Sequence, residues 1–143
     1  MKIATTIVRM LLGLVFLVFG LNGFLHFIPN MQMPNTAMQF FVGMAATGYM
    51  IPLLFGTQVL GGALLMLGLY VPLALALLAP VIVNIFLFHV FVVPSGLPVA
   101  IVVVAFELFL AWAHRDAFAP MLRARTEPAE ESAAATARPA AAS

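Results

Sequence analysis

The chain has 143 residues, of which 64% are hydrophobic and only 8% are charged, and its net charge is +1. Ordinary soluble domains carry about 25% charged residues, so this composition excludes a soluble globular domain. The small net charge and the lack of a basic stretch exclude a nucleic-acid-binding surface. Cysteine is absent, which excludes disulfides, thiolate metal sites and CxxC redox chemistry.

Long apolar runs dominate the sequence. From Met10 to Phe106 there is no Lys, Arg, Asp or Glu. As a helix, a run of about 20 apolar residues crosses a hydrocarbon core of about 30 Å. The predicted fold is therefore all-α, a four-helix transmembrane bundle within residues 1–118. Its spans are expected at about residues 3–27, 52–69, 72–93 and 98–118.

The connections between the runs differ in length. Residues 28–34 (IPNMQMP) contain two prolines and break the first helix. Thr36 and Gln39 then have the spacing of a capping box, which predicts a short interfacial helix between spans one and two. The alternative, that this segment extends the second span, stays open. Residues 69–72 allow only a tight hairpin, so spans two and three should be antiparallel neighbours. The second span also contains glycines that predict close helix packing, namely Gly56, Gly61, Gly62 and Gly68.

The basic residues indicate the orientation. They lie before span one and after span four, at Lys2, Arg9, Arg115, Arg123 and Arg125. An even number of spans places both termini on one side, and the positive-inside rule makes that side cytoplasmic. Residues 119–143 are polar and rich in Ala and Pro, which predicts a disordered cytoplasmic tail.

Six polar side chains fall in the outer half of the predicted membrane region. By helical rise, Glu107 lies about 13 Å and Asn84 about 12 Å below the outer edge. An ionisable group at mid-depth costs about 2.5–3.5 kcal/mol, so Glu107 should face the interior, be protonated or pair with another group. Asn84 has nearly the same depth and is a suitable hydrogen-bond partner. We predict a polar pocket open to the outer face, lined by Asn22, His26, Gln58, Asn84, His89 and Glu107. The alternative is that these side chains only hydrogen-bond helices together.

A quinone-like ligand suits the predicted pocket. Its ring carbonyls need donors such as His89 and Asn84, and the Glu107 carboxyl is suited to exchange a proton. Haem is disfavoured because His26 and His89 form only one histidine pair and His26 lies at the interface. No helix carries histidines or carboxylates at metal-ligand spacing, so no metal site and no catalytic residue are predicted.

Several segments resemble a known family. FLVFGLNGFLHFIP, NIFLFHVF and AWAHRDAF are similar to segments of the DoxX-like family of small four-span bacterial membrane proteins, over about residues 10–122. The resemblance implies the bacterial plasma (inner) membrane, and a redox role, since the family takes its name from a membrane subunit of a thiosulfate:quinone oxidoreductase. It supplies no catalytic residues.

The composition, the polar residues and the resemblance together indicate an expected function. It is that of a non-catalytic subunit of a membrane oxidoreductase assembly, not an enzyme on its own. The expected partners are the lipid bilayer and other membrane proteins or a second copy. The alternative function is a membrane assembly or anchoring protein that binds no ligand.

Overall fold

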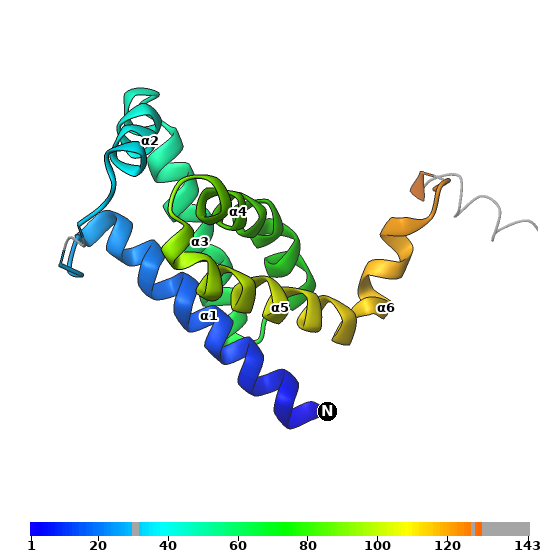
Figure 1. Cartoon of the computed structure of the whole chain (residues 1–143). Helices are drawn as coiled ribbons and strands as arrows, with labels where there is room; N and C mark the ends of the chain where they lie inside the picture. The colour runs from blue at the N-terminus through cyan, green and yellow to red at the C-terminus, as the bar shows by residue number, and fades with distance from the viewer. Residues whose placement is uncertain (30–31, 127, 130–143) are drawn as a thin grey trace, which may run out of the picture.

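The computed structural model describes residues 1–29, 32–126 and 128–129, and every regular element in that part is helical. The all-α prediction is therefore confirmed (Figure 1). The elements in chain order are α1 (Lys2–Leu25), α2 (Asn35–Ala46), α3 (Met50–Leu67), α4 (Val71–Phe91), the 3-10 turn η1 (Pro94–Gly96), α5 (Leu97–Ala113), α6 (Arg115–Phe118) and the 3-10 turn η2 (Ala119–Leu122).

Four helices, α1, α3, α4 and α5 with the preceding η1, are long and apolar enough to cross a membrane. Only 22% to 33% of each span is buried inside the protein. Large apolar side chains such as Ile7, Leu53 and Leu108 are exposed on the outside of the bundle. Such a surface is stable in lipid and not in water, because no polar groups cover it. The protein is a multi-pass membrane protein.

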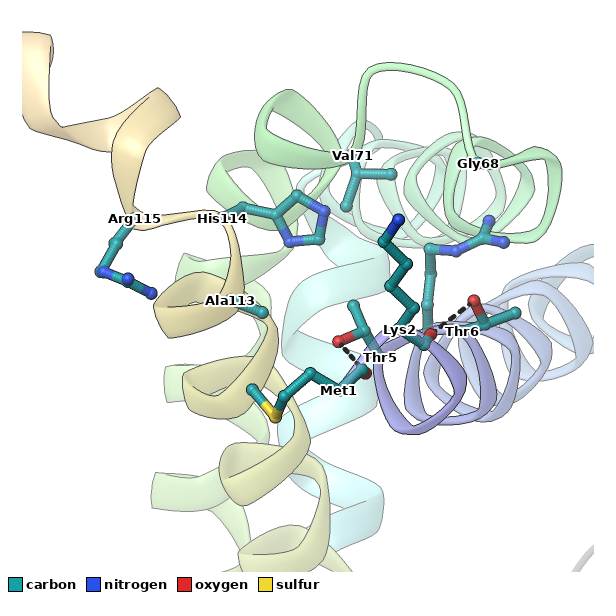
Figure 2. A pocket seen from close by; sticks show the side chains of 10 residues that line it. Met1, Lys2, Thr5, Thr6, Gly68, Val71, Ala113, His114 and Arg115 are labelled. Atoms are coloured by element: carbon teal, nitrogen blue, oxygen red, sulfur yellow. Dashed lines mark hydrogen bonds between the residues drawn. The ribbon is translucent and has the colours of Figure 1, made fainter.

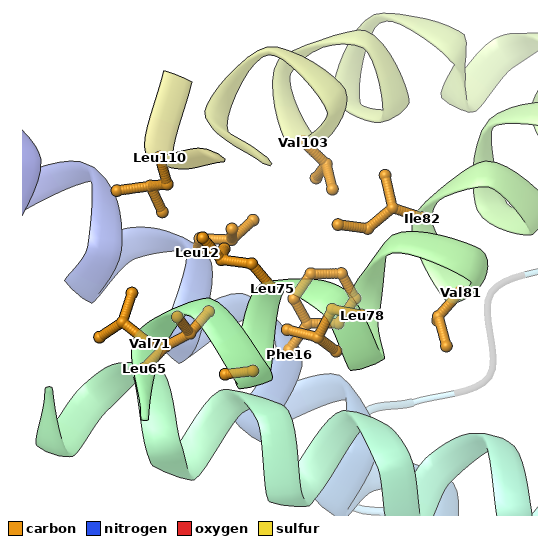
Figure 3. Close-up of a cluster of buried hydrophobic side chains, with 11 residues drawn as sticks. Leu12, Phe16, Leu65, Val71, Leu75, Leu78, Val81, Ile82, Val103 and Leu110 are labelled. Atoms are coloured by element: carbon orange, nitrogen blue, oxygen red, sulfur yellow. The ribbon is translucent and has the colours of Figure 1, made fainter. Parts of the chain in front are cut away.

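The four spans form a closed ring. α1 packs most extensively against α3, α4 lies between α3 and α5, and α5 returns to contact α1. α3 and α4 are joined by a short turn and pack side by side, as predicted from the hairpin. All four spans contribute side chains to one buried apolar cluster (Figure 3), which includes Leu12, Phe16, Leu65, Leu75, Leu78, Val103 and Leu110.

The contact between α1 and α3 depends on glycine. A Cβ atom on Gly62 of α3 would lie 2.5 Å from the Leu17 amide nitrogen and 2.8 Å from the Gly13 carbonyl oxygen of α1. The two backbones therefore touch directly, which is how small residues stabilise helix pairs in lipid. The predicted close packing is confirmed for Gly62, and also for Gly61, which lies against Leu78 of α4. It is wrong for Gly56, where a Cβ would meet no atom within 4 Å.

Arg9 joins α1 to the end of α3. Its guanidinium donates hydrogen bonds to the carbonyl oxygens of Leu65 and Met66 in the last turn of α3. The Leu65 carbonyl also accepts a hydrogen bond of 3.2 Å from the Gly68 amide, and the negative end of the helix dipole attracts a cation. Gly68 ends α3 with φ 71°, a conformation that favours glycine, and its Cα lies against the same guanidinium.

α2 is a separate short helix at the end of the bundle far from the N-terminus (Figure 1). It packs on α3, and its Phe40 and Phe41 rings lie 5.1 and 5.7 Å from the Phe88 ring of α4. The predicted capping box is wrong. The helix begins directly after Pro34, which places Thr36 inside the first turn, where it makes no cap bond.

The fourth span ends at Ala113 and not at Phe118 as predicted. His114 leaves the helical conformation, and the charged side chains of Arg115 and Asp116 follow it in α6. Charged groups are unfavourable in hydrocarbon, so the chain turns away at the membrane boundary. The segment predicted as a disordered tail begins with the helical turn η2, and residues 127 and 130–143 of it lie outside the described residues.

Candidate functional site

The six polar residues predicted to line one pocket lie in three environments. Gln58 and Glu107 are buried, with 5% and 8% of their surface exposed. Asn22 and His89 are half-buried, whereas His26 and Asn84 are exposed. The structure thus brings two of the six residues into the bundle interior and leaves two on its surface.

The interior carboxyl belongs to Glu107 of α5. It lies on the same helical face as the buried residues Ala100, Val103 and Leu110, because these positions recur at intervals of three and four. Its Oε2 atom is buried and has no hydrogen-bond partner within the described part of the chain. Buried polar atoms are normally hydrogen-bonded, so this oxygen retains a capacity for an additional partner.

Gln58 of α3 is buried against α1. A Cβ atom on Gly20 would lie 3.0 Å from the Gln58 Cβ and 2.8 Å from the Val59 amide nitrogen. Only the missing side chain at Gly20 lets α1 lie this close to the glutamine. Gly20 was not predicted as part of the site, although Gly13, Gly20 and Gly23 in one span were a usable signal of close packing.

Asn22 and His26 terminate α1. The Asn22 Oδ1 atom accepts a hydrogen bond of 2.7 Å from the Ile28 amide, beyond the end of the helix. His26 has the left-handed φ of 51°, and its amide donates to the Asn22 carbonyl at 2.8 Å. This is the geometry of a helix C-cap, occupied here by histidine in place of the usual glycine. Both residues therefore have a structural role at the end of α1.

His89 of α4 is held by packing and by one hydrogen bond. Its Nδ1 lies 2.8 Å from the Ile85 carbonyl oxygen. Because a carbonyl can only accept, we assign the proton to Nδ1. The other edge of the ring faces Gly96, where a Cβ would lie 2.1 Å from Cδ2 and 2.3 Å from Nε2. Gly96 is thus required for the position of His89, which its place in a turn sequence did not reveal.

Asn84 lies on the outer face of α4. The exposed positions of this helix follow one stripe, which we call the α4 outer face: Leu73, Ala76, Pro80, Val83, Asn84, Leu87 and Phe91. Asn84 is the one polar side chain in that stripe. It therefore faces away from the interior that holds Glu107, contrary to the predicted pairing.

Two polar groups of the α4 outer face are without their usual hydrogen-bond partner. No hydrogen bond within the described residues reaches the Asn84 carboxamide. One turn away, Pro80 has no N–H and cannot donate the bond that the Ala76 carbonyl would otherwise accept. The face thus presents the Asn84 carboxamide to its surroundings, and the Ala76 carbonyl lacks its usual helical donor.

Among the residues that the structure describes, no group of three or more His, Cys, Asp or Glu side chains is placed to bind a metal ion. The structure therefore offers two chemically distinct candidate sites. One is a buried carboxyl with an unpartnered oxygen. The other is an amide on the lipid-facing side of a span.

Comparison with known proteins gives one match. The family model described as DoxX matches residues 4–90, which extend from α1 almost to the end of α4. The match includes FLVFGLNGFLHFIP and all but the last residue of NIFLFHVF, and it ends before AWAHRDAF. No curated protein and no solved structure matches the chain. Since the matched region exceeds half of the chain, the protein belongs to the DoxX family.

Proposed function

We propose that the protein is a non-catalytic subunit of an oxidoreductase assembly in the bacterial plasma membrane. The redox assignment is supported by the resemblance to the DoxX-like family. That family takes its name from a membrane subunit of a quinone-reducing enzyme. Both termini are assigned to the cytoplasm. The start of α1, the α3–α4 turn and the end of α5 line one pocket and so lie at one end of the bundle. That end, which we call the Lys2 end, carries Lys2, Arg9 and Arg115, in agreement with the positive-inside rule.

The observation that carries this proposal is the exposed carboxamide of Asn84. Water is absent from the hydrocarbon core, so a polar group there is stable only with a hydrogen-bond partner. The partner cannot come from the interior, because Asn84 lies on the α4 outer face. A transmembrane helix of another subunit supplies such a partner, and the small side chain of Ala76 allows that helix to approach closely.

Site-directed photo-cross-linking tests this contact. The chain has no cysteine, so a single introduced thiol carries the label alone. Val83→Cys places it on the α4 outer face beside Asn84, and Val102→Cys places it on the outer side of α5. The two valines are 56% and 49% exposed. By helical rise both lie about 17 Å from the Lys2 end of their helices, so they are matched in depth.

In native membranes, the label on Val83→Cys should form an adduct with a protein. The label on Val102→Cys should form adducts with lipid only. Mass spectrometry of the adduct should identify a subunit of a redox enzyme. An adduct with a second copy of this chain alone would contradict the proposal, and so would equal labelling from both positions. A partner without a redox cofactor would favour the alternative of an assembly or anchoring protein.

The unpartnered Oε2 of Glu107 supports a second candidate function, binding of a quinone-like ligand in the bundle interior. A protonated Glu107 carboxyl donates a hydrogen bond to a ring carbonyl, and the Gln58 amide is a second buried donor. Solvent extraction of the purified protein tests this candidate. Quinone recovered from the wild type and lost from Glu107→Leu would support it, and extracts free of quinone from both proteins would contradict it.

A further inference from the structure

A pocket of about 530 Å³ lies at the Lys2 end of the bundle. Three parts of the chain line it: the first turns of α1, the turn between α3 and α4, and the junction of α5 with α6. Figure 2 shows the side chains of Lys2 and His114 directed into the same space beneath Val71. The pocket was not predictable from the sequence, because the residues that line it come from segments far apart in the chain.

The pocket is electropositive. Its lining includes Lys2, Arg9, Arg115 and the imidazole of His114, and no carboxylate. Asp116, the next residue after Arg115, is exposed and does not belong to the lining. Cations gathered without an acidic neighbour attract an anion, which has to come from outside this part of the chain.

The roles of these cations differ. The Arg9 guanidinium is bound to the carbonyls that end α3. Arg115 donates to the Trp112 carbonyl at 3.2 Å, its guanidinium lies 5.0 Å from the Trp112 ring centre, and Figure 2 shows it pointing away from the pocket. His114 donates its Nδ1–H to the Leu110 carbonyl at 2.9 Å, and its Nε2 remains for the pocket, where it donates to a phosphate oxygen when the ring is an imidazolium. Lys2 makes no hydrogen bond through its ammonium group within the described residues and is thus the principal ligand for an anion.

The position of the pocket along the membrane normal indicates which anion it binds. It lies where α1 begins and α5 ends, which is the height of lipid phosphates when these helices span the hydrocarbon core. The segments that line it also carry exposed apolar side chains, including Ile3, Ile7, Leu67 and Leu69. A phosphodiester in the pocket would therefore have its acyl chains beside apolar side chains.

From this combination of cavity, uncompensated charge and depth, we propose that the pocket binds the phosphate headgroup of an anionic phospholipid, with Lys2 and His114 as its ligands. Basic pockets between spans at the membrane surface are suited to such headgroups. This binding site is independent of the partner proposed for the α4 outer face.

Native mass spectrometry of the purified full-length protein tests the proposal. Phosphatidylglycerol and phosphatidylcholine with identical acyl chains are added in turn. Lys2→Gln removes one positive charge from the pocket lining and Lys2→Arg keeps it. Arg123→Gln is the matched control, because it removes one exposed charge that the pocket lining does not include. Lys2 is itself exposed, so its substitution leaves the fold intact.

The wild type should retain phosphatidylglycerol in preference to phosphatidylcholine. Lys2→Gln should weaken that retention about fivefold, as expected for the loss of one basic residue at an anionic surface. Lys2→Arg and Arg123→Gln should retain it. Equal retention of both lipids would overturn the proposal, as would equal losses from Lys2→Gln and Arg123→Gln. Inorganic phosphate that displaces the lipid completely at low millimolar concentration would show a site for the free anion and would also overturn it.

Discussion

Gly62→Ala is expected to lower the free energy of unfolding by about 1–3 kcal/mol, the usual cost of overpacking a close contact. The added Cβ would lie 2.5 Å from the Leu17 amide nitrogen and 2.8 Å from the Gly13 carbonyl oxygen. Both are backbone atoms, so no side-chain rotation relieves the clash. α1 and α3 have to move apart, and this is the most extensive helix contact in the bundle.

Gly56→Ala is the matched control for this prediction. Gly56 lies in the same helix, α3, and a Cβ there would meet no atom within 4 Å. Alanine is the better helix former by about 0.5–1 kcal/mol, so this variant should be as stable as the wild type or more stable. Circular dichroism during titration of detergent-solubilised protein with SDS measures both effects. If the two variants lost the same stability, direct backbone contact between α1 and α3 would be contradicted.

Glu107→Leu is expected to raise the free energy of unfolding by about 1–3 kcal/mol, the cost of a buried polar group without a partner. Glu107 is 8% exposed and its Oε2 has no hydrogen-bond partner in the described part of the chain. Leucine removes the polar atoms and is accommodated among apolar neighbours such as Val103 and Leu110. The same SDS titration measures the change.

Glu107→Gln is the control for this prediction, and the sign of the Glu107→Leu change tests the alternative hypothesis that Glu107 holds helices together by hydrogen bonds. Glutamine keeps a polar head of similar size, so its stability should stay near that of the wild type. A helix-joining role predicts the opposite order, with leucine the least stable of the three proteins. A stabilised Glu107→Leu protein that has lost its activity in the assembly would mark the carboxyl as functional, since functional sites often retain groups that destabilise the fold.

The span positions were predictable because they depend on length and composition alone. A bilayer requires about 20 apolar residues per helix, and the runs near 3–27 and 72–93 satisfy that requirement without any knowledge of packing. The tight connection at 69–72 also determined which spans are neighbours. The helix end at Ala113 was misjudged because the apolar residues Ala117 and Phe118 extend the run past the charged pair before them.

Which side of each span faces the bundle interior was much less predictable. α3, α4 and α5 are apolar on every side, so they lack the polar stripe that indicates the outer face of a helix in a soluble protein. A polar residue was then assumed to face inward. That assumption held for Glu107 and Gln58, and it was wrong for Asn84. The sequence does not distinguish a polar residue that faces the interior from one that faces another subunit, because both need a hydrogen-bond partner within the membrane.

Asn84 is the proposed contact point for another subunit, so the loss of its amide should release the protein from the assembly. Asn84→Leu is compared with Thr57→Val on α3, where the lost hydroxyl already bonds the Leu53 carbonyl at 2.8 Å. Native gel electrophoresis of mildly solubilised membranes should show the wild type and Thr57→Val in one large assembly and Asn84→Leu released from it. An Asn84→Leu protein that stays in an assembly of unchanged size would contradict the claim.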